Sequence, residues 1–324
     1  MVSIRHFVSL DHRWLSSPKD VSKPPSKELR NQDTINMIFG IVGLGIMGGS
    51  IAKALRTSAT PDDKIFALDK NNESLNAALT AGIIDRAFTP SETNKMLAEA
   101  DMLFVCLYPA ATLEFFREHK GDYKDGAIIT DISGVKHELS VAMDEIRPDN
   151  AHLILGHPMA GGEKEGFAAS KGEYFLNHNY ILIKPAGGYE DEAAVEKFRS
   201  IIRRMGFTRI TEVDANTHDN KIGFTSQLCH VVACAMVESA GDSEITSFGG
   251  GSFEDLTRIA MINAPLWTEL FLANREKLVA HIESFEAQLD NLKKLIETQD
   301  ANGLQSLLAD VRQKRIQMQN NSSC

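Results

Sequence analysis

The glycine-rich stretch at residues 43–50, GLGIMGGS, restricts the possible folds of this chain more than any other feature. It follows a continuous apolar run, Ile38 to Val42, and leads into a helical pattern. A buried strand, a GxGxxG turn and a helix in this order predict the first βαβ unit of a dinucleotide-binding fold. We expect Gly43 to permit the tight turn, Gly45 to let a pyrophosphate approach the backbone, and Gly48 to let the helix pack closely on the strand.

The next predicted strand, Lys64 to Leu68, ends at an acidic residue, Asp69. An acid about 20 residues after the glycines is typical of a carboxylate that binds the adenosine ribose. Such a carboxylate would repel a 2′-phosphate, so the sequence predicts NAD rather than NADP; Lys70 either weakens this preference or is a solvated surface lysine. The expected cofactor contacts also include residues of the glycine turn and of the end of a later strand: Ile46, Met47, Leu107 and Tyr108.

Alternating strand and helix patterns continue beyond Asp69 and then give way to helical patterns alone. The fold class predicted is therefore an α/β Rossmann-type doubly wound sheet followed by an all-α C-terminal domain. We expect a disordered leader at 1–36, an NAD-binding domain at 37–213, a helical substrate and dimerisation domain at 214–318, and a tail at 319–324. The further strands expected in the sheet are Met102 to Leu107, Ala127 to Thr130, Leu153 to Leu155, Tyr180 to Ile183, and Arg209 to Val213.

His157 is the candidate proton acceptor. It follows the predicted strand Leu153 to Leu155, at the sheet edge where open α/β folds bind ligands, and is held between Gly156 and Pro158. The alternative is a hydrogen-bonded loop histidine without a chemical role. Ser133, at the end of another strand, is expected within reach of His157 and the nicotinamide, or to cap the helix that starts near Val135.

Two patterns mark the helical part of the chain. His218, Ile222, Ser226 and His230 recur at four-residue steps, and such a row is either the wall of a pocket or a polar seam between helices. An apolar stripe further on suits packing against another helix or a second subunit. That stripe consists of Leu278, Ile282, Phe285, Leu289, Leu292 and Ile296.

Composition excludes several classes of protein. The 324 residues carry a net charge of −10 and no basic cluster, so nucleic acid is not an expected partner. No apolar run reaches the roughly 18 residues of a membrane-spanning helix, and residues 1–36 lack the apolar middle of a secretory signal. The four cysteines form no CxxC pair and predict buried thiols in a reducing cytoplasm. No cluster of metal ligands is evident.

Taken together, these motifs resemble those of the prephenate dehydrogenase family. The resemblance covers about Met37 to Lys314. It rests on GLGIMGGS, Asp69, DISGVK (131–136), GHPMAGGEKEG (156–166), SQLCH (226–230), and GGGSFEDLTRIA (249–260) followed by Pro265 and Trp267.

This resemblance implies NAD-dependent oxidative decarboxylation of prephenate to 4-hydroxyphenylpyruvate in tyrosine biosynthesis. It also implies a homodimer formed through the helical domain, which completes the active site. No chorismate mutase segment or ACT domain is recognisable, so we expect the short, single-function form. The site residues implied are His157 as the catalytic histidine, Ser133 as its support, Arg258 as the clamp on a substrate carboxylate, and Glu163, His230, Gln227 and Trp267 in the substrate pocket.

The oxidative decarboxylation itself requires a histidine and an arginine, independently of the resemblance. The ring hydroxyl must lose a proton while hydride leaves the same carbon, which requires a neutral imidazole as base. A dianionic substrate requires a fixed cation, and a guanidinium can donate two parallel hydrogen bonds to a carboxylate.

Two departures from the family bear on the substrate. Many relatives have His and Pro where this chain has Gln227 and Cys229, and Glu254 stands where arginine is common. Gln227 removes a possible positive charge near the substrate side chain, so arogenate, with an amine in place of the keto group, stays open as the substrate. Glu254 removes another cation from the start of its helix.

Two further hypotheses remain. A β-hydroxyacid dehydrogenase would share GLGIMG, but its catalytic lysine motif is missing from the expected helical half and GHPMAG would be unexplained. A non-catalytic dinucleotide-binding regulator could dimerise through the stripe from Leu278 to Ile296, but this hypothesis leaves His157, Ser133 and Arg258 without a role.

Overall fold

The structure is a computed structural model that describes residues 36–162 and 164–322. The predicted leader lies outside the described residues except for Asn36. Glu163, a predicted pocket residue, and the last two residues of the predicted tail also lie outside them.

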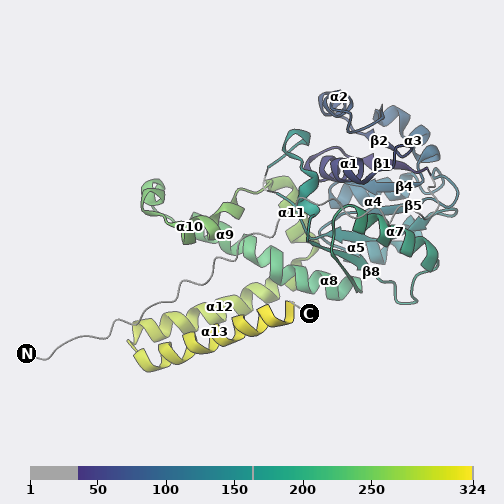
Figure 1. Cartoon of the computed structure of the whole chain (residues 1–324). Coiled ribbons are helices and arrows are strands. Elements are labelled where there is room, and N and C mark those ends of the chain that lie inside the picture. The colour runs from purple at the N-terminus through teal and green to yellow at the C-terminus, as the bar shows by residue number, and fades with distance from the viewer. Residues whose placement is uncertain (1–35, 163, 323–324) are drawn as a thin grey trace, which may run out of the picture. The chain divides into compact units, whose positions relative to one another are not determined.

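A six-stranded sheet forms the first part of the described chain, with the order β3-β2-β1-β4-β5-β6 (Figure 1). Every neighbouring pair in it is parallel. This is the doubly wound order of dinucleotide-binding folds, and the predicted fold class is confirmed. The ligand crevice of such a sheet lies at the carboxyl ends of β1 and β4, where the strand order reverses. The strands are β1 (Ile38–Val42), β2 (Lys64–Leu68), β3 (Arg86–Phe88), β4 (Met102–Val105), β5 (Ile128–Asp131) and β6 (His152–Leu153).

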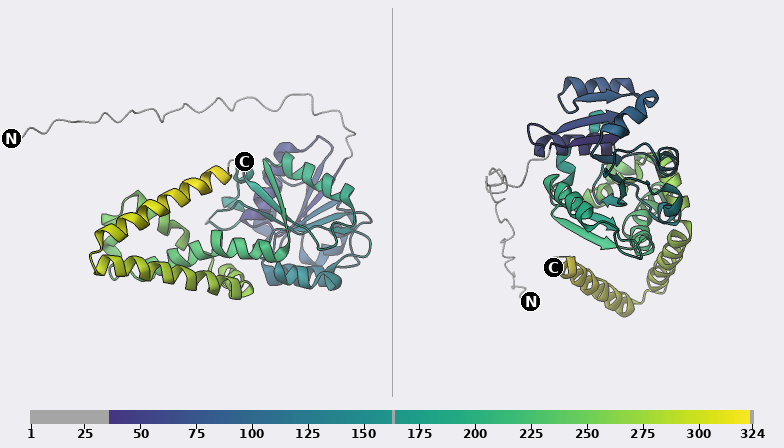
Figure 2. Two further views of the ribbon diagram at one scale, coloured as in Figure 1. Left: turned by 90° about the horizontal axis from the view of Figure 1, so that it is seen from below. Right: turned by 90° about the vertical axis from the view of Figure 1, so that its right-hand side faces the viewer.

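Helices cover both faces of this sheet, as Figures 1 and 2 show. Local signals place several of their ends: the Asn71 side chain caps α2, and Asp191 caps α7. The elements are α1 (Ile46–Ser58), α2 (Asn72–Thr80), η2 (Pro90–Glu92), α3 (Thr93–Glu99), α4 (Pro109–Glu118), α5 (His137–Val141), α6 (Met143–Ile146), the turns η3 (Phe167–Ala169) and η4 (Gly172–Phe175), and α7 (Glu192–Arg204).

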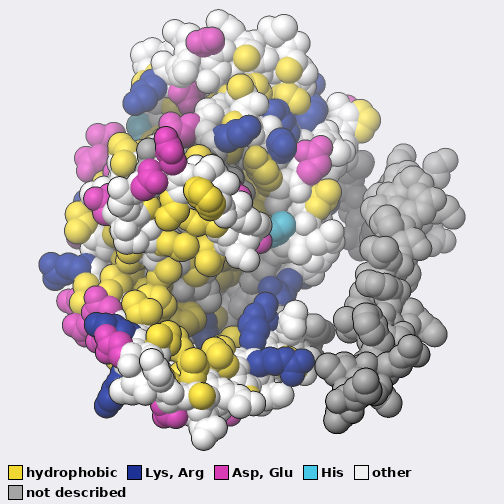
Figure 3. All heavy atoms as spheres, turned by 90° about the vertical axis from the view of Figure 1, so that its left-hand side faces the viewer, with side chains coloured by type: hydrophobic (Ala, Val, Ile, Leu, Met, Phe, Trp, Pro, Cys, Tyr) yellow, Lys and Arg dark blue, Asp and Glu magenta, His cyan; other side chains and the backbone are white. Residues whose placement is uncertain are grey.

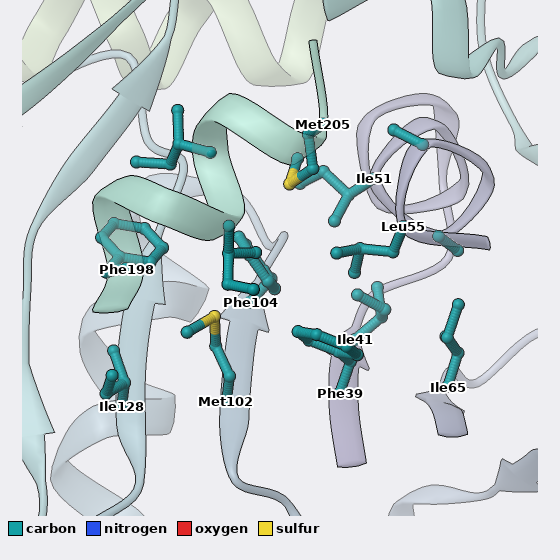
Figure 4. Packing of buried hydrophobic residues seen from close by; sticks show 14 of the residues in the cluster. Phe39, Ile41, Ile51, Leu55, Ile65, Met102, Phe104, Ile128, Phe198 and Met205 are labelled. Atoms are coloured by element: carbon teal, nitrogen blue, oxygen red, sulfur yellow. The ribbon is translucent and has the colours of Figure 1, made fainter. Parts of the chain in front are cut away.

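Burial on both faces explains why the strands read as continuous apolar runs. Phe39, Ile41 and Phe104 point to one face and pack against Leu55 of α1 and Phe198 of α7 (Figure 4). Neighbouring strand residues, which point the opposite way, pack against α3 and α4 on the other face. The two cores hold the glycine turn and the carboxyl ends of the strands in place.

The predicted extension of the sheet beyond β6 is wrong. The next strands form a separate three-stranded sheet of β7 (Gly156–Pro158), β8 (Asn179–Ile183) and β9 (Arg209–Val213). His157 is thus the middle residue of β7, paired antiparallel with Ile181, and does not follow the end of a strand of the main sheet.

Gly156 gives the reason for this break between the sheets. Its backbone N–H donates to the Asp131 side chain at 3.2 Å, where a backbone carbonyl of β5 would accept if the main sheet continued. A Cβ at this position would lie 2.6 Å from the Tyr180 ring, so the absence of a side chain lets β7 pack against β8.

The part of the described chain from Ala215 onward is helical. The predicted helix from Thr217 to Val237 is present with a π-helical segment in its middle, and Asp214 caps its start by accepting the Thr217 N–H. A hairpin of two long helices carries the predicted apolar stripe (Figure 1). The elements are α8 (Ala215–Ile222), the π segment η5 (Gly223–Gln227), α9 (Leu228–Glu238), η6 (Ser243–Phe248), α10 (Gly251–Thr257), η7 (Arg258–Ala260), α11 (Ala264–Ala273), α12 (Arg275–Glu297) and α13 (Ala301–Ser322).

The cysteines correct a further expectation. Cys106, Cys229 and Cys234 are free thiols, as predicted, but Cys229 is exposed and the other two are only half-buried. Cys324 lies outside the described residues. Within residues 36–162 and 164–322, no helix is long and apolar enough to cross a membrane, and no group of His, Cys, Asp and Glu side chains is arranged to hold a metal ion.

Candidate active site

The glycine turn after β1 has the shape of a dinucleotide cradle. Gly43 has φ of +88°, and a Cβ there would lie 2.7 Å from the Cys106 carbonyl oxygen. A Cβ on Gly48 would lie 1.9 Å from the Gly43 carbonyl oxygen, so only glycine lets α1 approach β1 this closely. Gly45, by contrast, faces open space, and among the described residues no side chain caps the amino end of α1. The amides of this end are therefore available to a pyrophosphate, and the turn fits the cofactor that the sequence predicts.

Asp69 stands beside this turn at the carboxyl end of β2. Its carboxylate accepts hydrogen bonds from the backbone N–H of Leu44 at 2.5 Å and of Asn71 at 2.7 Å. These two bonds hold the side chain next to the glycine turn, where a ribose bound above α1 would lie.

A cavity of about 600 Å³ joins the cradle to the helical part of the chain. Both regions contribute to its wall, which also contains His157 and Ser133. Six predicted cofactor residues line it, namely Gly45, Ile46, Met47, Gly48, Leu107 and Tyr108; Gly43 and Asp69 lie outside the lining.

His157 reaches this cavity from a buried network. Its Nε2 lies 3.9 Å from where a Cβ on Gly134, another lining residue, would be. Its Nδ1 lies 2.9 Å from Nε2 of His218. Burial is the main cause that holds the pKa of His157 well below its usual 6.5, and the Lys136 ammonium adds to the effect. The ring is therefore neutral at physiological pH, as a general base must be.

A fully buried ion pair supports the strand that carries His157. Lys136 Nζ donates to the Asp131 carboxylate at 2.5 Å and to the Gly156 carbonyl at 2.5 Å. The Asp131 carboxylate also accepts the N–H groups of Ser133 and Gly156. The side chains of Lys136 and Asp131 are both 0% exposed. Asp131 and Lys136 thus tie the Ser133 loop to β7.

The Ser133 side chain corrects one expectation. Helix α5 begins only at His137, so Ser133 does not cap it. Its Oγ is buried and has no hydrogen-bond partner among the described residues, although Ser133 lines the cavity. A buried hydroxyl normally has a partner, which makes this Oγ suited to a bound substrate or nicotinamide.

The row of residues at four-residue steps forms part of the pocket wall. Ile222, Ser226 and His230 line the cavity, whereas His218 lies behind it. Four-residue steps overshoot the 3.6-residue turn of an α-helix. The wider turn of the π segment offsets this drift and keeps the three side chains on one side.

The predicted substrate residues differ in their placement. His230 and Trp267 both line the cavity, and their ring centroids are 3.6 Å apart. Gln227 lines it too, but its amide group donates to the Leu270 carbonyl and its oxygen accepts from Asn274. Arg258 begins η7 with an exposed side chain outside the lining, although Ile259 next to it is part of the wall.

Sequence reasoning missed four contributors. Lys164, within the GHPMAGGEKEG motif, lines the cavity but is not among the predicted site residues. The other three lie on the side of His157 away from the cavity: Asp131 pairs with Lys136, and Asp219 accepts from His218. The DISGVK motif already contained Asp131 and Lys136. Their separation in the sequence concealed the link to His157.

Comparisons with known proteins agree with this geometry. The family described as "Prephenate dehydrogenase, nucleotide-binding domain" matches residues 51–212, and "Prephenate dehydrogenase, dimerization domain" matches residues 214–310. Prephenate dehydrogenase of Bacillus subtilis is 30% identical over 271 residues, covering 82% of this chain and 71% of that protein. Cyclohexadienyl dehydrogenase of Zymomonas mobilis is 28% identical, covering 84% of this chain and 92% of that protein.

A solved structure extends the comparison to three dimensions. The crystal structure of prephenate dehydrogenase from A. aeolicus, in complex with hydroxyphenyl propionate and NAD+, superposes with a TM-score of 0.78 at 29% identity. It covers 88% of this chain and 100% of that chain. This chain therefore belongs to the prephenate dehydrogenase family and is an NAD-dependent dehydrogenase.

Proposed function

We propose that this protein oxidatively decarboxylates prephenate to 4-hydroxyphenylpyruvate with NAD+, in tyrosine biosynthesis. The observation that carries the proposal is the cavity in which a half-buried, neutral His157 faces both the glycine turn of the cofactor domain and the wall of the helical domain.

The reaction assigns a role to each group at His157. The substrate ring hydroxyl gives its proton to Nε2 of His157 as the carbon that bears the hydroxyl loses hydride. NAD+, when bound on the glycine turn, supplies the hydride acceptor. The bond between the ring and its carboxylate then breaks, carbon dioxide leaves, and the bonding electrons complete the aromatic ring. Ser133 Oγ, which has no hydrogen-bond partner among the described residues, would hydrogen-bond the substrate hydroxyl or the nicotinamide and align them with His157.

Two cations are candidates for holding the substrate carboxylates. The family resemblance assigns this role to Arg258, and the described lining of the cavity adds Lys164. We propose Arg258 as the clamp because a guanidinium binds a carboxylate through two parallel hydrogen bonds, whereas an ammonium acts as a point charge.

Replacing Arg258 with alanine should raise the Michaelis constant for prephenate by roughly 10- to 100-fold, since hydrogen bonds to charged groups contribute about 1.5–3 kcal/mol each. Steady-state kinetics with Lys164→Ala alongside tests the assignment. An unchanged Michaelis constant in Arg258→Ala, with a large increase in Lys164→Ala, would transfer the role to Lys164. The Michaelis constant for NAD+ is the control and should stay within about twofold.

The exposed apolar side chains of the helical part support a homodimer. Phe248 is 89% exposed, Met261 69% and Leu272 66%, which is unusual for a surface that stays in water. Hydrophobic side chains gather on the face shown in Figure 3. The match of residues 214–310 to a dimerization domain favours a second copy of this chain as the partner. Sedimentation of the purified protein should give twice the chain mass of 35.7 kDa, and a monomer at micromolar concentration would contradict the proposal.

The decisive assay follows formation of the reduced cofactor at 340 nm with two substrates and two cofactors. Prephenate with NAD+ should give the highest kcat/KM, and NADP+ should react poorly because Asp69 stands where a 2′-phosphate would lie. Higher kcat/KM with arogenate would reassign the substrate, and the neutral Gln227 in the wall leaves that outcome open. No reaction with either substrate would reject the proposed function.

A further inference from the structure

A chain of hydrogen bonds runs from His157 away from the cavity into the helical domain. Nδ1 of His157 lies 2.9 Å from Nε2 of His218, and Nδ1 of His218 lies 2.7 Å from Oδ1 of Asp219. His218 is 1% exposed and Asp219 is 0% exposed. Water therefore does not compete for these bonds, and each contact must contain one proton.

The protons of this chain can be assigned from its far end. A carboxylate only accepts hydrogen bonds, so Nδ1 of His218 carries a proton and donates it to Asp219. Burial lowers the pKa of His218, although the hydrogen bond to Asp219 opposes this effect. A neutral His218 has no second ring proton, so its Nε2 must accept. Nδ1 of His157 is then the donor, and the lone pair of His157 lies on Nε2, the nitrogen nearest Gly134 in the cavity wall.

Asp219 is itself held rigidly. Its two carboxylate oxygens accept the backbone N–H groups of Lys136 at 2.9 Å and His137 at 2.8 Å, at the start of α5. The acceptor end of the chain is thus fixed to the cofactor domain, while Asp219 and His218 belong to α8. The carboxylate therefore cannot turn away from His218 without losing two backbone hydrogen bonds.

We propose that His218 and Asp219 are positioning residues that set the tautomer of His157 and stabilise its protonated form. They keep the Nε2 lone pair directed at the cavity before reaction. When the substrate hydroxyl transfers its proton to Nε2, the positive charge that forms on His157 is stabilised by the Nδ1–H bond to His218, which Asp219 polarises in turn. The inference rests on the proposed function for the origin of that proton, but the tautomer itself does not depend on a substrate.

The first test reads the tautomer directly. Long-range ¹H–¹⁵N spectra of the full-length protein, labelled at histidine and recorded without substrate, should show His157 protonated at Nδ1 and unprotonated at Nε2. His157→Gln assigns the signal by its loss. A ring protonated at Nε2 instead would overturn the proposal, whatever the enzyme turns over.

The second test uses kinetics. His218→Leu removes the acceptor, and we expect kcat with prephenate to fall by about 10²- to 10⁴-fold, the range that general-base catalysis contributes. Replacing the orienting carboxylate of a serine protease costs about 10⁴-fold, at the upper end of this range. Michaelis constants should change by no more than about threefold, because neither His218 nor Asp219 lines the cavity. His218→Gln, whose side-chain oxygen can still accept from Nδ1 of His157, should recover at least about tenfold in kcat.

A matched control shows whether the fall in kcat is specific to His218 or follows from replacing a histidine elsewhere in the chain. His152→Leu changes a half-buried histidine in β6, outside the cavity, and should leave kcat within about twofold. A folded His218→Leu variant with kcat near wild type would reject the positioning role. If His218→Leu does not fold, the spectrum of the wild-type protein still decides the tautomer. A wild-type protein that is inactive with prephenate and arogenate would reject the proposed function alone.

Discussion

Replacing His157 with alanine is expected to lower kcat for prephenate oxidation by about 10²- to 10⁴-fold, the usual contribution of a general base. The dissociation constant for NAD+ should stay within about twofold, because the glycine turn and Asp69 follow β1 and β2 and the hydrogen bonds of Asp69 do not involve the His157 ring. Stopped-flow kinetics measures kcat, and titration of the protein fluorescence with NAD+ measures the dissociation constant. Full activity in this variant would remove His157 from the mechanism.

The pH dependence of the wild-type enzyme provides an independent measure of the same group. A base must be unprotonated to act, and burial holds the pKa of His157 well below 6.5. Lowering the pKa extends the active form to lower pH, so kcat/KM should remain on its plateau at pH 6.5 and decline only below it. An acid limb with its midpoint at or above 6.5 would contradict the burial of this ring.

Replacing Lys136 with methionine should lower the free energy of unfolding by about 3–5 kcal/mol, the usual cost of removing one partner of a buried ion pair. Methionine has similar length but cannot bond Asp131, which would be left charged at 0% exposure, nor the Gly156 carbonyl. Urea denaturation followed by circular dichroism measures this loss.

An exposed ion pair provides the matched control for Lys136. Arg117 pairs with Glu145 at 2.9 Å with 42% and 63% of the two side chains exposed. Arg117→Met should cost less than about 1 kcal/mol, because surface ion pairs contribute little. Equal losses in the two variants would show that the Lys136–Asp131 pair contributes no more than a surface pair.

Local patterns predicted the parts of the fold that depend on a few consecutive residues. The three glycines of the turn and the acid after β2 act through neighbours on the same segment or on the adjacent strand. The apolar runs also predicted strands buried on both faces, because this pattern reports burial directly.

The errors concern features that depend on distant segments. The run from Leu153 to Leu155 looks like one more parallel strand, but Tyr180 and Asp131 decide that the chain leaves the sheet at Gly156. Ser133 has the residue type of a helix cap, yet α5 starts too far along the chain for it to act as one. For the strand and for the helix cap alike, contacts with distant residues determined a structure that differs from the one the local sequence pattern predicted.

The sequence alone was sufficient to identify His157 as the candidate base and NAD as the cofactor, because the glycine turn, the acid and the histidine motif each act within a short span. Only the folded chain decided how His157 is held. Its contact with His218 joins residues 61 positions apart, across the boundary between the sheet and α8. Periodicity indicates which face of a segment is buried, but it does not indicate which buried side chains contact each other. The protonation of His157 depends on such a contact, its hydrogen bond with His218.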